Sequence, residues 1–189
     1  MLRHLPNLVT ILRMLLVVPL CWLIHDGRYE GALVIAAVAG FSDAVDGFLA
    51  KHYGWQTWLG GILDPIADKL LLMAAFLWLA FAGDVPRWLA ALVIGRDLAI
   101  VGGAIAYYGL IGRFDAAPTL LSKLTTVVQI VFVLVELLRL SHWIEMPDSV
   151  RNAAIGVTAV LTIGSGLHYV VVWSGRAWRT RPAAGRRQA

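Results

Sequence analysis

Six apolar segments run through this chain, and each is close to the length that one membrane-spanning helix needs. A helix must be about 20 residues long to cross the hydrocarbon layer of a bilayer. Only 15% of the 189 residues are charged, whereas a soluble domain has about a quarter of its residues charged. The sequence therefore predicts an all-α polytopic membrane protein with six transmembrane helices, at residues 6–25, 31–50, 61–82, 87–109, 119–140 and 151–174.

The connections between the segments are short, so we expect a single domain over residues 1–189 with a basic tail at about 175–189. Six spans place both termini on one side of the membrane. That side holds nine lysines and arginines, namely Arg3, Lys51, Arg113, Lys123 and the five arginines of the tail, and the other side holds Arg28, Arg87, Arg139 and Arg151. By the positive-inside rule both termini are cytoplasmic. We expect an integral protein of the bacterial inner membrane, whose tail meets anionic headgroups rather than nucleic acid.

Four aspartates lie at the ends of two neighbouring apolar segments, where unneutralised charge is costly for a membrane protein. Asp43 and Asp46 end the second segment, and Asp64 and Asp68 begin the third. Residues three or four apart share a helix face, and antiparallel neighbours bring the two pairs to one edge. Two carboxylates about 4 Å apart repel by roughly 4 kcal/mol at an effective dielectric constant of about 20. Hard cations such as Mg²⁺ or Mn²⁺ take oxygen ligands, so we expect two divalent ions at the cytoplasmic edge.

This segment resembles the CDP-alcohol phosphotransferase family, whose signature is D-x2-D-G-x2-A-R-x8-G-x3-D-x3-D. Every position matches except one, because Lys51 stands where the family has arginine. The resemblance covers most of the chain. Residues 6–10 with Arg13 look like the family's amino-terminal helix, and residues 63–69 and 122–126 look like the branch that makes phosphatidylglycerophosphate or cardiolipin.

The resemblance implies a six-helix membrane enzyme, a homodimer with two divalent metal ions. Such an enzyme transfers a phosphatidyl group from CDP-diacylglycerol to an alcohol and releases CMP. By carry-over, Asp68 is both a metal ligand and the general base. The other metal ligands are Asp43, Asp46 and Asp64, and the CDP site is lined by Gly47, Ala50, Lys51 and Gly60. Lysine cannot form the bidentate fork of arginine, so we expect retained activity with altered nucleotide affinity.

The candidate acceptor-binding residues are Arg96 and Lys123. An ionisable residue within a span marks a functional site by default, although a structural Arg–Asp pair with Asp97 is the alternative. No second arginine follows Arg96 in its segment. This looks more like the cardiolipin synthases, whose acceptor is phosphatidylglycerol, than like the phosphatidylglycerophosphate synthases, whose acceptor is glycerol-3-phosphate. Both acceptors stay open. In the sixth segment, Gly164-Ser165-Gly166 is typical of close helix contacts.

A divalent-cation transporter is the alternative from another functional class. It would favour carboxylates near the middle of the membrane and two related halves of the chain. The aspartates stand at one edge, and the sequence shows no internal repeat. The enzyme is therefore the preferred hypothesis.

Overall fold

Six α-helices make up almost all of the chain that the structure, a computed structural model, describes. The described backbone covers residues 5–53, 58–111 and 119–179, and the described side chains lie within 9–42, 66–103 and 119–171. The helices are α1 (Leu5–His25), α2 (Tyr29–Tyr53), α3 (Trp58–Ala82), α4 (Arg87–Ile111), α5 (Leu120–Leu140) and α6 (Asp148–Arg179). The all-α class is confirmed, and each predicted segment falls on one helix.

The sixth helix is longer than its apolar segment. It begins at Asp148, whose carboxylate in the first turn is attracted to the positive end of the helix dipole and so stabilises the start of the helix. It continues to Arg179, into the predicted basic tail. Apolar length therefore underestimates this helix, because backbone hydrogen bonding continues where the apolar sequence ends.

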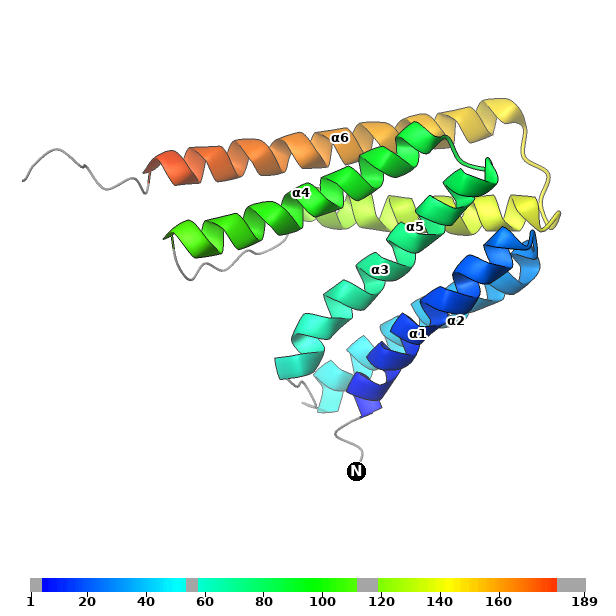
Figure 1. The fold of residues 1–189 in the computed structure, drawn as a ribbon, viewed down its shortest axis with the longest axis horizontal. Coiled ribbons are helices and arrows are strands. Elements are labelled where there is room, and N and C mark those ends of the chain that lie inside the picture. Colours follow the sequence, from blue (N-terminus) through cyan, green and yellow to red (C-terminus); the bar gives the residue numbers. More distant parts are fainter. Residues whose placement is uncertain (1–4, 54–57, 112–118, 180–189) are drawn as a thin grey trace, which may run out of the picture.

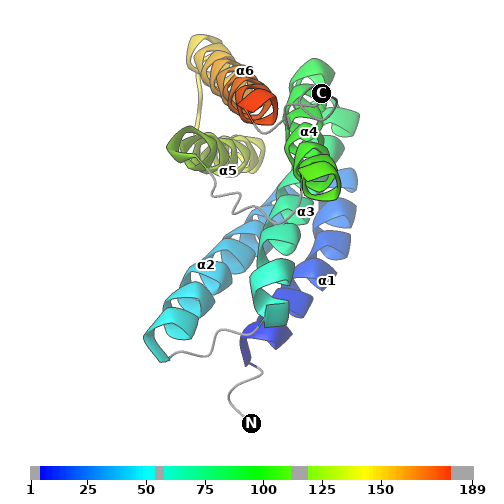
Figure 2. The same cartoon turned by 90° about the vertical axis from the view of Figure 1, so that its left-hand side faces the viewer.

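The helices form two groups of three that diverge from one end of the molecule (Figure 1). In the first group α1 contacts both α2 and α3, and in the second α6 contacts both α4 and α5. The groups meet where α3 packs on α4 and α5, and where α2 packs on α5. The α1–α2, α3–α4 and α5–α6 connections all lie at the same end, and Figure 2 shows α4, α5 and α6 above α1, α2 and α3. We call this the connected end and the opposite one the open end.

The connections at the connected end are tight because α1, α3 and α5 end in the same way. Gly27 and Gly83 follow α1 and α3 with φ of 70° and 88°, in the left-handed region that glycine adopts without strain. His142 takes this position after α5 with φ of 58°. In each case the next amide bonds back to a helical carbonyl, as Arg28 N does to Leu23 O at 2.8 Å.

The apolar core also lies toward the connected end. Leu20 and Ile24 of α1 and Leu79 of α3 are buried almost completely. Phe76 and Phe132 stack with their ring centres 5.8 Å apart and tie α3 to α5. Among the described side chains, these buried residues fall late in α1, α3 and α5, toward the connected end.

Large apolar side chains are exposed on all six helices, among them Val18 (71% exposed), Phe41 (73%) and Val160 (70%). Within the described residues, Leu120–Leu140 and Asp148–Val171 are long and apolar enough to cross a membrane. The apolar stretches Val9–His25 and Tyr29–Ser42 are shorter. The six helices are thus confirmed as helices, and six membrane crossings stay a prediction.

Candidate active site

The two aspartate pairs lie on the parts of α2 and α3 that face the open end. Asp43 and Asp46 are in the last half of α2, and Asp64 and Asp68 are in the first half of α3. The end of α2 and the start of α3 lie near each other at the open end (Figure 1). The side-chain positions at most of these sites fall outside the described residues, namely Asp43, Asp46, Gly47, Ala50, Lys51, Gly60 and Asp64. Their convergence on metals and nucleotide stays a prediction.

Asp68 is the one predicted metal ligand whose side chain is described, and it is paired with a cation. Arg13 Nη1 donates to Asp68 Oδ1 at 2.5 Å and so joins α1 to α3. The Arg13 side chain is only 3% exposed, whereas that of Asp68 is 44% exposed. The pair compensates the cost of burying a guanidinium, and the carboxylate stays accessible.

The accessible carboxylate of Asp68 offers the oxygen ligands that a hard divalent ion takes, and such an ion would compete with the Arg13 guanidinium for it. Among the described side chains, no group of three or more His, Cys, Asp and Glu lies close enough to hold a metal ion. Three of the four predicted ligands are outside that part of the chain.

An apolar cavity of about 460 Å³ lies beside the Arg13–Asp68 pair. Its walls come from α1, α2, α3 and α5. Apart from the ion pair, all of the residues that line it are apolar: Ala36, Ala37, Ala39, Gly40, Phe41, Leu71, Leu72, Ile130, Val133 and Leu134. The candidate base therefore stands where a polar site meets an apolar space.

Arg96 is buried in the middle of α4 and ties three helices together. Its Nη1 donates to Asp97 Oδ1 at 2.5 Å, so the structural pair considered from the sequence is present. Its Nη2 donates to Ser122 Oγ on α5 at 2.7 Å and to Ser165 Oγ on α6 at 2.6 Å. Its Nε has no hydrogen-bond partner within the described residues.

Lys69 belongs to the same cluster. Its Nζ lies 3.4 Å from Asp97 Oδ1, the oxygen that Arg96 also binds. Two cations share one carboxylate, so among the described side chains the cluster has one positive charge in excess. Because Asp68 and Lys69 are consecutive residues, they point to different neighbours of α3: Asp68 toward α1 and Lys69 toward α4.

Lys123, the other acceptor candidate, is exposed in the first turn of α5. Thr119 caps this helix, because its side chain accepts a hydrogen bond from Ser122 N at 3.2 Å. The cap fixes the turn that carries both Ser122 and Lys123. Arg96 bonds Ser122, and Lys123 is the next residue of the chain. Arg96 is buried, whereas Lys123 is exposed to solvent.

The sequence did not identify Lys69 or Ser165 as parts of this cluster. The close contact predicted for the Gly164–Gly166 segment is present at Gly166, where an added Cβ would lie 3.6 Å from Arg96 Cγ. A Cβ added at Gly164 would meet no atom of another described helix within 4 Å. A buried arginine in an apolar span requires polar partners. This requirement could have indicated Ser165 as a partner of Arg96, because Ser165 is a polar residue within an apolar segment.

A second polar cluster lies at the connected end. Glu136, only 2% exposed, accepts hydrogen bonds from Arg139 Nε at 2.7 Å and Arg151 Nε at 2.9 Å. Arg151 also donates to the Asp84 carbonyl, and Tyr29 OH donates to Asp84 Oδ2 at 2.7 Å. These bonds join the start of α2, the α3–α4 connection, α5 and α6.

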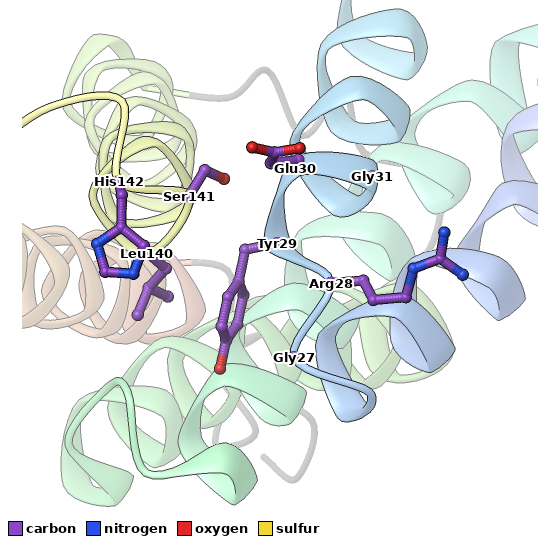
Figure 3. A pocket seen from close by; sticks show the side chains of 8 residues that line it. All are labelled: Gly27, Arg28, Tyr29, Glu30, Gly31, Leu140, Ser141 and His142. Atoms are coloured by element: carbon purple, nitrogen blue, oxygen red, sulfur yellow. The ribbon is translucent and has the colours of Figure 1, made fainter.

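A polar pocket of about 420 Å³ lies beside this second cluster. In Figure 3, Tyr29 lies between Ser141 and His142 on one side and Arg28, which is directed away from them, on the other. The lining charges of Arg28 and Glu30 have opposite signs. The pocket is formed at the connected end, so it is separate from the Asp68 site.

Comparisons with known proteins bear on this site. A family model described as CDP-alcohol phosphatidyltransferase matches residues 3–164. A probable phosphatidylglycerophosphate synthase of Mycobacterium tuberculosis is 34% identical over 173 residues, which cover 88% of this chain and 80% of that protein. A probable cardiolipin synthase (CMP-forming) of Drosophila melanogaster is 31% identical over 182 residues, covering 88% of this chain and 56% of that protein.

A CDP-diacylglycerol–glycerol-3-phosphate 3-phosphatidyltransferase of Bacillus subtilis is 29% identical over 185 residues, which cover 88% of this chain and 93% of that protein. Proteins named for two different acceptors are thus similar to this chain to comparable degrees. The comparisons favour a transferase over a divalent-cation transporter and leave the acceptor undecided.

Proposed function

Because the chain belongs to the CDP-alcohol phosphatidyltransferase family, and is therefore a transferase, we propose that it transfers the phosphatidyl group of CDP-diacylglycerol to phosphatidylglycerol and releases CMP. The product is cardiolipin. The observation that carries this proposal is Asp68, an accessible carboxylate of the signature segment beside an apolar cavity. The second candidate acceptor is glycerol-3-phosphate, which is favoured by the names of the M. tuberculosis and B. subtilis relatives.

In the proposed reaction Asp68 accepts the proton of the acceptor hydroxyl. The hydroxyl oxygen forms a bond to the phosphatidyl phosphorus, and the phosphoanhydride bond to CMP breaks. Two divalent ions, Mg²⁺ or Mn²⁺, held by Asp43, Asp46, Asp64 and Asp68, would neutralise the phosphate charge and stabilise the leaving CMP. Gly47, Ala50, Lys51 and Gly60 would line the CDP site. Phosphoryl transfer depends mainly on such positioning and charge neutralisation.

Arg96 and Lys123, together with Lys69, would receive the acceptor phosphate. Among the described side chains, Arg96 and the partly exposed Lys69 share one carboxylate, so this cluster has one positive charge in excess. The exposed Lys123 contributes little because water screens it. One charge matches a phosphodiester such as phosphatidylglycerol. A phosphomonoester carries about −1.5 to −2 at neutral pH, so glycerol-3-phosphate would be less well neutralised.

We also propose that all six helices span the bacterial inner membrane. Both termini and the aspartates would then face the cytoplasm, where CMP is released. Exposed apolar side chains on every helix support this placement, as does the distribution of lysine and arginine along the sequence. We expect the enzyme to act as a homodimer.

The acceptor is tested with purified protein in lipid nanodiscs, supplied with CDP-diacylglycerol, Mn²⁺ and one acceptor at a time. The expected result is CMP release with phosphatidylglycerol and formation of cardiolipin. CMP release with glycerol-3-phosphate alone would replace the proposed acceptor by the second candidate. Release with neither acceptor would contradict both.

A further inference from the structure

A line of buried polar side chains runs along the contact between α5 and α6, two helices that run in opposite directions (Figure 1). We call it the α5–α6 seam. Its members are Ser122, Thr125 and Gln129 on α5 and Thr158, Thr162 and Ser165 on α6. All six are 9% exposed or less, and on each helix they are three or four residues apart, so they share one face. Both helices are long and apolar enough to cross a membrane, where buried polar side chains require a reason.

Hydrogen bonds cross the seam at successive turns of α5. Thr125 Oγ1 lies 2.8 Å from Leu121 O of its own helix and 3.2 Å from Leu161 O of α6. One turn further along, Gln129 Nε2 donates to Thr162 Oγ1 at 3.0 Å. A shift by one residue moves a helix about 1.5 Å and turns its side chains by about 100°, which would break both bonds to α6. The seam therefore fixes the register of α5 against α6.

Gln129 is a costly residue for a helix contact that needs only to be stable. Its side chain is 0% exposed, and its Oε1 has no hydrogen-bond partner among the described residues. A buried polar atom without a partner costs free energy, and a leucine would avoid that cost. Thr162 does not depend on the amide, because its own hydroxyl donates to Thr158 O at 2.7 Å. Fixing the register of paired helices is the best-attested use of such buried polar groups.

The register of α5 matters because it determines what surrounds Arg96. Within the described residues α4 packs on α3 and α6 but not on α5. Arg96 Nη2 nevertheless donates both to Ser122 Oγ of α5 at 2.7 Å and to Ser165 Oγ of α6 at 2.6 Å. Two hydroxyls from different helices must therefore meet at one nitrogen. α5 also packs on α2 and α3 through apolar side chains such as Phe132, but the cross-helix hydrogen bonds that fix its register come from α6.

We propose that Gln129 and Thr162 are positioning residues for acceptor binding, because their bond holds the register in which Ser122 and Ser165 together orient Arg96. The proposal rests on the proposed function for the role of Arg96 at the acceptor phosphate. Gln129 follows Ser122 by seven residues, about 10 Å along a helix. It acts through the position of α5 and not through contact with the acceptor.

The first test compares Thr162→Val with Thr158→Val, which make the same change one turn apart on α6. Thr158 is also buried, but its hydroxyl donates within α6, to Ala154 O at 2.8 Å. Thr162→Val should raise the KM for the acceptor about threefold to tenfold, the range expected for one interhelical hydrogen bond. The donor KM should stay within about twofold, and Thr158→Val should leave both KM values within that limit. Thr162→Ser keeps the accepting oxygen and should restore the acceptor KM.

Gln129→Leu removes the same bond from the other side. It should raise the acceptor KM as Thr162→Val does, and the double variant should be no worse than either single one, since both changes break one shared contact. Gln129→Leu should not lower the Tm, because it leaves no buried polar atom without a partner in the seam. Equal behaviour of Thr162→Val and Thr158→Val would overturn the proposal, as would an equal rise of the donor and acceptor KM values.

A second test requires neither metal nor turnover. In a Cys21→Ala background, Ser122→Cys and Ser165→Cys place thiols at the two positions that bind the same Arg96 nitrogen. A short bis-methanethiosulfonate reagent should join them readily while the rest of the seam is intact. Adding Thr162→Val should slow the reaction about threefold or more, and adding Thr158→Val should not. Equal rates would overturn the fixed register, whatever the acceptor is.

The two tests distinguish this proposal from the proposed function. An unchanged acceptor KM in Arg96→Lys would overturn the acceptor role of Arg96 and with it the route from the seam to the acceptor, while the cross-linking rates would still report the register. A raised acceptor KM in Arg96→Lys, together with equal behaviour of Thr162→Val and Thr158→Val, would overturn the positioning role alone. Should Thr162→Val not fold, Gln129→Leu gives the same comparison.

Discussion

The consecutive residues Asp68 and Lys69 show how one turn of helix serves two sites. Asp68 binds Arg13 of α1, and Lys69 lies beside Asp97 of α4. Successive residues of a helix point about 100° apart, so α3 directs a carboxylate toward α1 and an ammonium toward α4 at neighbouring positions. The division of labour on α3 follows from this geometry.

Asp68→Asn should reduce the rate of CMP release by about a hundredfold to ten-thousandfold, because general base catalysis contributes that much. The amide keeps the shape of the side chain and loses its basicity. Asp84→Asn is the matched control, since Asp84 bonds Tyr29 at the connected end and should leave the rate nearly unchanged. Full turnover in Asp68→Asn would exclude Asp68 as the base.

Arg96→Lys should raise the KM for the acceptor about tenfold and leave the KM for the donor unchanged. An ammonium cannot reproduce the fixed fork that binds Asp97, Ser122 and Ser165 together. Steady-state kinetics with each substrate varied in turn measure this, and Arg139→Lys at the connected end is the control. An equal rise in both KM values would indicate a general loss of structure.

At the scale of helices, the sequence predicts where each helix lies along the chain, but it does not predict which helices pack against each other. Apolar length and the breaks at Gly27 and Gly83 locate the helices within a few residues. The signature segment locates Asp68. The partners of Arg13 and Arg96 come from helices far away in the chain, and no local pattern encodes which helices meet. For the same reason the shared use of Asp97 by Lys69 and Arg96 became visible only in three dimensions.

The bond from Tyr29 to Asp84 connects the start of α2 to the α3–α4 turn. Burial, followed by the hydrogen bond to Asp84 and its charge, raises the pKa of Tyr29 to about 12. The unfolded value is about 10. The folded state therefore favours the protonated phenol, and this stabilisation is complete below about pH 10 and is lost as the pH rises toward 12.

The Tm difference between wild type and Tyr29→Phe should accordingly shrink between about pH 10 and 12, where the phenol of the unfolded chain ionises before that of the folded protein. Thermal unfolding in detergent at several pH values measures it. Other groups titrate in this range in both proteins, so the difference is the informative quantity. A difference that is constant with pH would contradict the assignment.

For the whole molecule, the orientation in the membrane determines which compartment receives CMP. Glu145 lies in the α5–α6 connection and is exposed. In a Cys21→Ala background, Glu145→Cys should react with a membrane-impermeant maleimide in intact spheroplasts as fully as in lysed ones. Reaction only after lysis would reverse the predicted orientation, and the aspartates would then face the periplasmic side.

Among the described side chains the apolar core lies toward the connected end, so we expect the helices to pivot there and their far ends to move most. A helix of 25 residues such as α3 is about 37 Å long at 1.5 Å per residue. A pivot of about 5° where the helices are packed would move the far tip by roughly 3 Å, about the width of a water molecule. Small adjustments in the well-packed region would thus be amplified at the ends of α2 and α3 that carry the aspartates. Mutations at the pivot would act on substrate entry from a distance.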